Sequence, residues 1–479
     1  MSHGISVVSA PLLSCTSPKR PAVVASETHR TIAVVGAGFT GTMLAVHLVE
    51  QAAGPLRILL IDRAGTVGSG VAYATPNARH LLNVRVANMS AYDSDPEHFV
   101  RWLARNEASG MPAPGRAFVS RGLYGQYLRS TLSTCLAAHP GSSLIGVAAE
   151  VTGLQVEAEG VRLMTANGDH LVDCVALCVG NFPPALPVTP KATPRGAKRY
   201  VANPWSGALS QVGVDDTVLV IGTGLTMVDV VIDLRSHGHR GPIVAASRRG
   251  FLPLAHREIT TYPPFLPTGR LPQSVVALMR TVRREIAAAA ARGIDWRAVL
   301  DALRPQTQSL WRVLPTAERR KFLRHLRPYW EVHRHRVAPM VAAEIAALQR
   351  TGQLSVHAGR TAGIELTDTE VVLTLRRRGE TRLRLEGDWL VNCSGPQLDY
   401  ERIDDPLVRT MFESGLARPD PLSLGLDVSD DYRLVDRDGR PSDVLFALGP
   451  PIRGSLWETT AVPDIRKQCA ALALRLCEV

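Results

Sequence analysis

Three glycines near the start of the chain have the spacing of a site that binds a dinucleotide. Gly36, Gly38 and Gly41 follow the apolar run 31–35, which is typical of a buried parallel strand. The first glycine permits a sharp turn, the second lets backbone approach a pyrophosphate, and the third lets the next helix pack on the strand. The following apolar strand ends in Asp62, where a carboxylate accepts hydrogen bonds from a ribose. The sequence therefore predicts a dinucleotide at this turn.

A second glycine turn repeats most of this pattern about 185 residues later. Gly222 and Gly224 follow another short apolar strand, but the third position is Met227. The next strand ends in Arg248 and Arg249 rather than in an acid. A guanidinium pair could bind the 2′-phosphate of NADPH, whereas NADH would lose its usual acceptor. The alternative, that both arginines are solvated surface residues, stays equally open.

Two such sites in one chain suggest that electrons pass between a nicotinamide and a flavin. The cofactors would then carry the chemistry, and side chains would orient substrate and exclude water. Guanidinium groups suit a small anionic substrate, and a histidine, carboxylate or amide could act as a base or contact the flavin. The candidates are Arg257, Arg334, Arg336, Arg453, His256, Glu258 and Asn83. For each arginine, a surface position or a structural ion pair is the alternative.

The elements that position these residues indicate an α/β fold. We predict two Rossmann-like, three-layer dinucleotide-binding domains, the second of which carries a helical insertion. We place a disordered leader at 1–30, a first segment with the first glycine turn at 31–205 and the domain of the second turn with its helical insertion at 211–345. A last segment is placed at 350–479. The β-rich stretch 146–179 is interpreted as a small meander.

The C-terminal part contributes a further glycine turn and a helix. A strand runs into Gly449 and Pro450, and the last helix follows with Thr459 or Thr460 as its predicted N-cap. The N-terminal end of that helix could stabilise a reduced, anionic flavin.

Composition narrows the class of protein. The chain has 479 residues, 45% of them hydrophobic, which suits a large core, and no apolar run reaches the length of a membrane helix. The net charge is +10, and residues 270–336 carry fourteen arginines and one lysine against five acids. These arginines are interleaved with apolar residues, so we expect an electropositive path for anions and not a nucleic-acid site.

The cysteines and histidines exclude two kinds of site. Seven cysteines include no CxxC pair, which argues against a disulfide reductase and favours a reducing, cytoplasmic location. The pair His333 and His335 lacks further ligands at suitable spacing, so no metal is expected.

Four segments now support a resemblance. From about residue 30 to 479 the chain resembles a bacterial group of two-dinucleotide-binding flavoproteins that includes an FAD-dependent urate hydroxylase and an aspartate N-monooxygenase. The segments are 68–73 (Gly-Ser-Gly-Val-Ala-Tyr), 80–84 (His-Leu-Leu-Asn-Val), 222–229 (Gly-Thr-Gly-Leu-Thr-Met-Val-Asp) and 454–461 (Gly-Ser-Leu-Trp-Glu-Thr-Thr-Ala).

The resemblance implies which residues bind each cofactor. It assigns FAD to the first glycine turn with Asp62, and NADH or NADPH to the second turn. It also implies that the NAD(P)H-binding domain (211–345) is inserted in the FAD-binding domain (31–205 and 350–479). The acid that often follows the last glycine in such flavoproteins is absent, since Gly449 is followed by Pro450. Backbone groups would therefore have to bind FAD at Gly449.

The resemblance also implies a function. We expect an FAD-dependent monooxygenase that consumes NAD(P)H and dioxygen and hydroxylates a small anionic substrate, with urate, giving 5-hydroxyisourate, as the preferred substrate. N-hydroxylation of an amino acid such as aspartate, a simple oxidase or reductase, and a non-catalytic FAD-binding redox sensor are the alternatives. The urate hydroxylase resemblance favours NADH, against the arginine argument. The sequence does not specify an oligomeric state.

Overall fold

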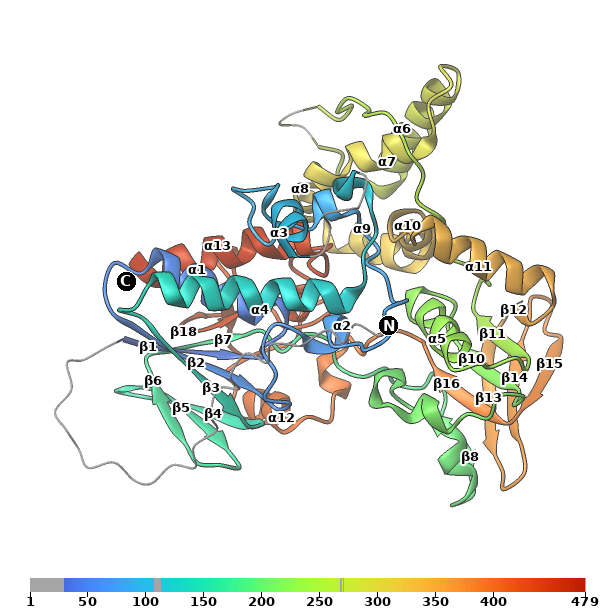
Figure 1. Ribbon diagram of the computed structural model, residues 1–479, viewed down its shortest axis with the longest axis horizontal. Coiled ribbons are helices and arrows are strands. Elements are labelled where there is room, and N and C mark those ends of the chain that lie inside the picture. Colours follow the sequence, from blue (N-terminus) through green and yellow to red (C-terminus); the bar gives the residue numbers. More distant parts are fainter. Residues whose placement is uncertain (1–29, 107–112, 268, 270, 479) are drawn as a thin grey trace, which may run out of the picture.

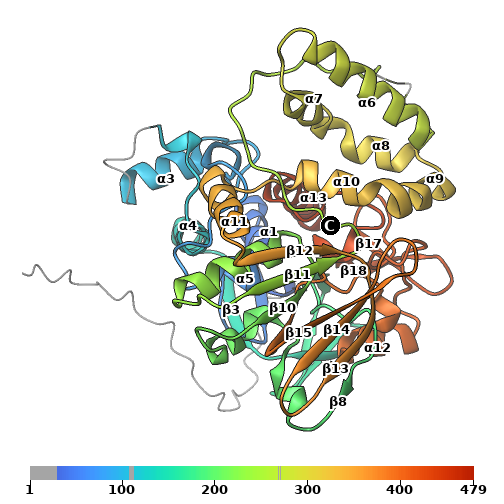
Figure 2. The ribbon, with the colours of Figure 1, turned by 90° about the vertical axis from the view of Figure 1, so that its right-hand side faces the viewer.

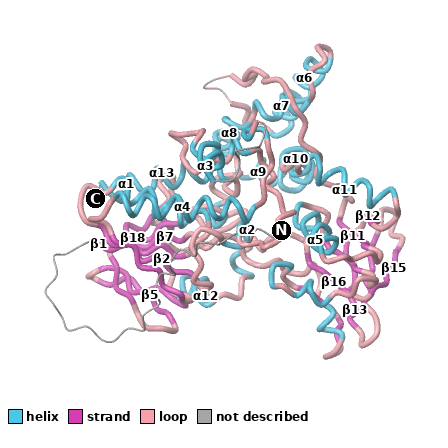
Figure 3. Tube along the Cα trace, in the orientation of Figure 1, coloured by secondary structure: helices cyan, strands magenta, loops and turns pink. Residues whose placement is uncertain are grey.

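The computed structural model describes residues 30–106, 113–267, 269 and 271–478. The predicted leader at 1–30 lies outside the described residues except for Arg30. Two groups of strands lie at opposite ends of the molecule, with helices above and between them (Figures 1 and 3). Each group contains a parallel sheet and one of the two glycine turns.

The first unit is built on a six-stranded sheet of order β17-β18-β7-β1-β2-β3. Its strands pair in parallel except at the edge, where β17 runs antiparallel to β18. The strands are β1 (Arg30–Val35), β2 (Leu56–Asp62), β3 (Ser143–Ala148), β7 (Cys174–Leu177), β17 (Arg433–Val435) and β18 (Pro441–Ala447).

Alternate residues of β1 face opposite layers, as the period of a strand requires. Ile32 and Val34 pack with one set of helices, and Ala33 and Val35 pack with a second, antiparallel sheet. The helices are α1 (Phe39–Gln51), α3 (His98–Asn106), α4 (Arg121–Ala138) and α13 (Val462–Glu478). The opposite layer contains β4 (Val151–Glu157), β5 (Gly160–Thr165), β6 (His170–Val172) and α12 (Pro406–Glu413). The unit therefore has the three predicted layers.

The second unit repeats this architecture on a five-stranded parallel sheet of order β12-β11-β10-β16-β9. Val218 and Val220 pack with the helical layer, and Leu219 and Ile221 pack with an antiparallel sheet. The parallel strands are β9 (Tyr200–Val201), β10 (Val218–Ile221), β11 (Ile243–Ser247), β12 (Leu354–Ala358) and β16 (Trp389–Asn392). The other two layers contain α5 (Leu225–Ser236), α11 (Pro339–Arg350), β8 (Lys191–Ala192), β13 (Arg360–Leu366), β14 (Val371–Arg376) and β15 (Arg382–Gly387).

A helical insertion separates β11 from α11 and rises above the two sheets (Figure 2). Its members are α6 (Val275–Ala290), α7 (Trp296–Ala302), α8 (Thr307–Val313), α9 (Thr316–Lys321), a π-helical turn (Phe322–Leu326) and α10 (Arg327–Arg334). No helix in the described ranges combines the length and hydropathy that crossing a bilayer requires.

The sheets correct two boundaries that we drew from sequence. Strands between 354 and 392 were placed in the second FAD segment, but β12 and β16 pair with β11 and β10 in the second unit. Strand β9 also joins that sheet, although the first segment was extended to 205. The stretch 146–179 is not one meander, because β7 pairs in parallel with β1 and only β4–β6 are antiparallel neighbours. Strand periodicity is local, whereas these pairings join residues that are far apart in the chain.

Candidate active site

The first glycine turn has no room for larger residues. Gly36 has φ +103°, and a Cβ on it would lie 2.3 Å from the carbonyl oxygen of Cys178. A Cβ on Gly41 would lie 1.8 Å from the carbonyl oxygen of Gly36. Both positions therefore require glycine: Gly36 for its backbone angle and its close approach to the backbone that follows β7, and Gly41 for the close approach of α1 to β1 and the turn.

The surroundings of this turn fit a dinucleotide. Gly38 begins α1 without a side-chain cap, so the N-terminal end of the helix is available to a phosphate. Gly70, in the short helix α2 (Gly70–Tyr73), lies directly against it, since a Cβ on Gly70 would be 3.0 Å from the Gly38 Cα. The Asp62 carboxylate accepts hydrogen bonds from the backbone N–H groups of Ala37 and Ala64, each at 2.9 Å. This fixes the acid beside the turn, where a ribose would lie.

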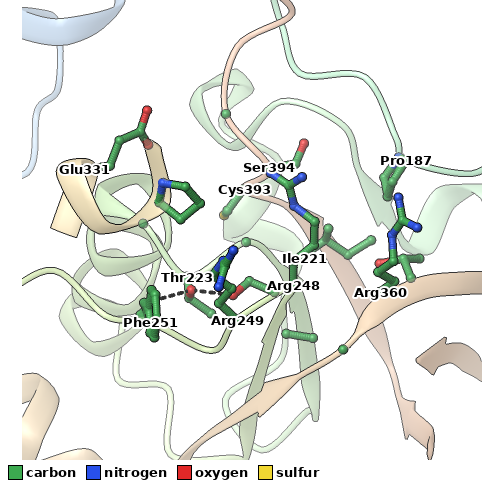
Figure 4. Close-up of a pocket in the computed structure, with 18 of the residues that line it drawn as sticks. Pro187, Ile221, Thr223, Arg248, Arg249, Phe251, Glu331, Arg360, Cys393 and Ser394 are labelled. Atoms are coloured by element: carbon green, nitrogen blue, oxygen red, sulfur yellow. Dashed lines mark hydrogen bonds between the residues drawn. The ribbon is translucent and has the colours of Figure 1, made fainter. Parts of the chain in front are cut away.

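The second glycine turn opens into a cavity of about 810 Å³ (Figure 4). Gly222 has φ +107°, and a Cβ on it would lie 2.0 Å from the carbonyl oxygen of Cys393. A Cβ on Gly224 would meet nothing within 4 Å, so space is left beside the helix end. Met227, which replaces the third glycine, is fully buried in the core of this unit.

One end of the cavity is strongly cationic. Arg248 and Arg249 line it, as a 2′-phosphate site would require. Arg249 also donates to the Tyr329 hydroxyl at 3.2 Å and lies over its ring, 5.0 Å from the centroid. Three further arginines from the antiparallel sheet complete this end: Arg360, Arg376 and Arg382. Sequence reasoning missed these three, because nothing in their local sequence signals that β13–β15 border the cavity.

Helix α10 also borders the cavity, where Glu331 and, just after the helix, His335 lie in the wall. His335 Nε2 lies 3.5 Å from Oε1 of Glu458, in the segment that follows β18. That segment begins at Gly449 (φ +75°), where a Cβ would lie 2.8 Å from Oγ1 of Thr40 in the first turn of α1. The segment 449–458 therefore connects the first glycine turn to the second cavity. We call this contact region, formed by α10 and residues 449–464, the junction.

Glu458 is the central carboxylate of the junction. It is buried and has φ +69°, an uncommon backbone angle for a residue with a side chain. Trp330 Nε1 donates to its Oε1 at 2.7 Å, and Arg334 Nε lies 3.5 Å from Oε2. Burial alone would raise the pKa of Glu458, but His335, Arg334 and Trp330 together lower it to about 2. Glu458 is therefore ionised at neutral pH.

The junction contains paired charges of both signs. Arg453 is buried, lies 3.3 Å from Oε1 of Glu331 and sits 4.6 Å from the centroid of the Trp457 ring. Burial lowers the pKa of the Arg453 guanidinium, with Arg327 acting in the same direction. The charged members are Arg327, Arg334 and Arg453 with Glu331, Glu458 and Asp464, and Arg304 pairs with Asp464 from outside the junction.

The remaining arginine candidates lie elsewhere. Arg336 is buried in an ion pair with Asp301, so its guanidinium already has a partner. Arg257 is largely exposed and lies 3.7 Å from Asp295. All four arginines proposed from sequence lie close to acids, which was the alternative for each; Arg334 and Arg453 do so at the junction and the other two elsewhere.

The three polar candidates, His256, Asn83 and Glu258, lie away from the cavity of the second unit. His256 Nε2 donates to the carbonyl oxygen of Asn83 at 2.9 Å, so these two residues meet across the two units. Burial lowers the pKa of His256 to about 4, which makes it a poor base near neutral pH. Glu258 is exposed and forms an ion pair with Arg116. None of these three faces the cavity of the second unit.

The predicted cap of the last helix is wrong in position. Helix α13 begins at Val462, and the Thr459 hydroxyl donates to the carbonyl oxygen of Gly449 at 3.1 Å or to Gln468 Oε1 at 2.9 Å. Thr459 therefore fixes the glycine turn against α13, a long-range role that its distance from Gly449 in sequence does not reveal.

The cysteines of the described residues are free and mostly buried. Burial raises the pKa of Cys135 and of Cys174 to about 12, so both are protonated thiols at neutral pH. Within the same residues, no group of three or more histidines, cysteines and carboxylates is placed to bind a metal ion.

Comparison with known proteins agrees with this geometry. A family model described as FAD-NAD(P)-binding matches residues 33–182, the part that contains the first glycine turn. An uncharacterized protein of Mycobacterium tuberculosis (strain H37Rv) is 22% identical over 531 aligned positions, covering 93% of this chain and 95% of that protein.

Solved structures share the fold along nearly the whole chain. An ornithine hydroxylase from Pseudomonas aeruginosa is 16% identical, with a TM-score of 0.63 and coverage of 94% of this chain and 99% of that one. A cadaverine monooxygenase from Erwinia amylovora, solved with FAD, is 13% identical, with a TM-score of 0.64 and coverage of 93% and 94%. An ornithine N-hydroxylase from Kutzneria, solved with reduced FAD, NADP+ and L-ornithine, is 15% identical, with a TM-score of 0.60 and coverage of 94% and 99%. The chain therefore has the two-domain dinucleotide-binding fold of these flavoproteins.

Proposed function

We propose that the protein is an FAD-dependent, NADPH-consuming monooxygenase that hydroxylates the nitrogen of a small amine, such as the amino group of an amino acid. The observation that carries the proposal is the junction. Residues 449–458 join the first glycine turn to the α10 wall of the second cavity, so two dinucleotides bound at the two turns would meet there. Such an arrangement suits hydride transfer between the two cofactors.

We propose nitrogen as the atom that receives oxygen because of the solved structures that share this fold. The similar solved structures include hydroxylases of ornithine and cadaverine, both of which are amines. Urate hydroxylation, which we preferred from the sequence, finds no support among them.

The residues of this chain would bind and orient the cofactors. When bound, FAD would accept hydride from NADPH and activate dioxygen for transfer of one oxygen atom. Gly36, Gly38 and Asp62 would bind the pyrophosphate and ribose of FAD, and Gly222 and Gly224 would bind the pyrophosphate of NADPH. The buried junction would exclude water from the reacting groups.

The first experiment tests the class of reaction. The purified protein should show a flavin spectrum, and ornithine, lysine, cadaverine, aspartate and urate should each be tested for product and for dioxygen-coupled NADPH consumption. We expect an amine to give a hydroxylated product in proportion to the NADPH consumed. Peroxide alone would indicate an oxidase, and a flavin that no small molecule helps to reduce or reoxidise would indicate a redox sensor.

The cationic end of the cavity predicts a preference for NADPH over NADH. Replacement of Arg248 by alanine should raise the KM for NADPH by about 10- to 100-fold, because a charge-assisted hydrogen bond of roughly 1.5 to 3 kcal/mol is lost. The KM for NADH should change little. The exposed Arg280, on α6, provides a matched control as Arg280→Ala. An unchanged ratio of the two KM values in Arg248→Ala would contradict the assignment of Arg248 to the 2′-phosphate.

A further inference from the structure

His335 occupies a position from which it can exchange a proton with a bound molecule. It follows directly after α10, is partly exposed with 29% of its side chain accessible, and lines the cavity of the second unit. Glu331 and Val332, from the preceding turn of the same helix, line the wall beside it.

A carboxylate fixes one face of the imidazole. Glu458 Oε1 lies 3.5 Å from His335 Nε2, and the Trp330 indole and Arg334 orient that carboxylate. An anionic partner at Nε2 favours the tautomer that carries its proton there, so Nδ1 retains the lone pair. The same negative charge stabilises the imidazolium that forms when Nδ1 accepts a proton.

The charges around His335 are mixed. Glu458 and Glu331 are the carboxylates that act on it, and Asp464 acts in turn on Glu458. Arg334 is its neighbour in sequence, Arg453 and Arg327 contact Glu331, and Arg304 contacts Asp464. The carboxylate nearest to the ring is thus ionised and buried, while the cations are paired with acids.

We infer that His335, oriented by Glu458, is the base that removes a proton from the ammonium group of the substrate. The inference rests on the proposed N-hydroxylation. An aliphatic amine is protonated at neutral pH and has no lone pair with which to attack an oxygen atom. His335 Nδ1 accepts one proton from R–NH₃⁺, leaving R–NH₂ and an imidazolium. Over the whole reaction R–NH₃⁺, O₂ and NADPH give R–NHOH, NADP+ and H₂O, so the proton leaves in water.

The test compares His335→Gln with the wild-type protein. Glutamine can still donate a hydrogen bond to Glu458 but cannot accept a proton. An imidazole is a weaker base than an aliphatic amine, so the bound substrate rests as an ammonium and its proton moves to His335 only as the nitrogen reacts. Product formation in the variant should fall on the order of 100-fold at neutral pH and then rise about tenfold per pH unit as the free amine loses its own proton.

Two measurements separate a base from a structural residue. FAD content should be unchanged in His335→Gln, and the rate of flavin reduction by NADPH should fall far less than product formation, because reduction needs no proton from the amine. His333→Gln is the matched control, because His333 lies on the same helix, interacts with the Tyr329 carbonyl oxygen and packs against Trp296. This control should leave the pH profile of product formation as it is in the wild type.

The possible results have distinct meanings. Identical pH profiles of product formation in the wild type and His335→Gln would overturn the assignment of His335. A parallel fall in flavin reduction and product formation, with no change in pH profile, would also overturn it, since His335 would then position the nicotinamide. A wild-type protein that binds FAD but hydroxylates no amine would refute the proposed function itself.

Discussion

At the scale of single residues, the arginine candidates differ in where they lie and in which acids they contact. Arg334 and Arg453 lie at the junction, whereas Arg336 and Arg257 have acidic partners elsewhere. Glu458 was not singled out from sequence, yet it is the carboxylate around which Trp330, Arg334 and His335 gather. Its importance follows from burial and from three partners on a different segment.

Replacement of Glu458 by glutamine should weaken the fold in a pH-dependent way. Because the pKa of Glu458 is lowered to about 2 in the folded protein, its ionised form stabilises the fold above the pKa of the unfolded chain. We expect the free energy of unfolding of Glu458→Gln to be lower by on the order of 3 kcal/mol at neutral pH. This difference should shrink as the pH falls from about 4.5 to about 2.

Urea unfolding of both proteins across this pH range would measure the effect. If the free energies of unfolding of the wild type and Glu458→Gln differed by the same amount at all pH values, the ionised carboxylate would not be the source of the stabilisation.

At the scale of elements, a buried ion pair joins the two units. Arg121 begins α4 of the first unit, and Asp229 lies in α5 of the second. Their side chains meet at 2.8 and 3.0 Å, and each is about nine-tenths buried. His80 Nε2 also donates to the backbone carbonyl of Asp229 at 3.0 Å. These contacts fix α5, and hence the second glycine turn, relative to the first unit.

Removal of one partner of this pair should lower the free energy of unfolding more than replacement of both partners by apolar residues. We expect Arg121→Ala to lower the free energy of unfolding by about 3 to 5 kcal/mol, because an acid is left buried without its cation. The double variant Arg121→Met with Asp229→Leu should recover most of that loss. Chemical denaturation would measure both.

A solvent-exposed pair supplies the control. Arg240 and Asp215 form an ion pair with both side chains mostly exposed to screening solvent, so Arg240→Ala should lower the free energy of unfolding far less than Arg121→Ala does. Equal losses in Arg121→Ala and Arg240→Ala would contradict a special role for the buried pair.

At the scale of the whole molecule, the two glycine turns serve separate cofactors in the proposed enzyme. Each turn lies at the carboxyl end of a parallel strand of its own sheet, and residues 449–458 connect the turns. A change at one turn should therefore remove one cofactor and spare the other.

Single added methyl groups test this independence. Gly41→Ala should lose FAD, because its Cβ would lie 1.8 Å from the Gly36 carbonyl oxygen. Gly222→Ala should retain FAD but slow its reduction by NADPH by about 100-fold or more, since the second turn would be displaced by the 2.0 Å approach to Cys393. Gly54→Ala is the control, because a Cβ there meets nothing within 4 Å. Loss of FAD from Gly222→Ala would contradict independent sites.

The two strand–turn–helix units could be predicted from the amino-acid sequence, because each depends on the spacing of neighbouring residues. Gly36, Gly38, Gly41 and Asp62 predicted the first strand–turn–helix unit, Gly222 and Gly224 predicted the second, and both three-layer units are present. Adjacent residues impose these features, because turn geometry and strand periodicity act over a few positions.

The contacts between segments far apart in the chain are known only from the folded structure. It assigned the strands from 354 to 392 to the second sheet, brought Arg360, Arg376 and Arg382 to the cavity, and set Glu458 against His335. Burial and long-range contact also decided which arginines are paired, and no local pattern encodes either property. The junction is therefore a consequence of how the two units pack on each other.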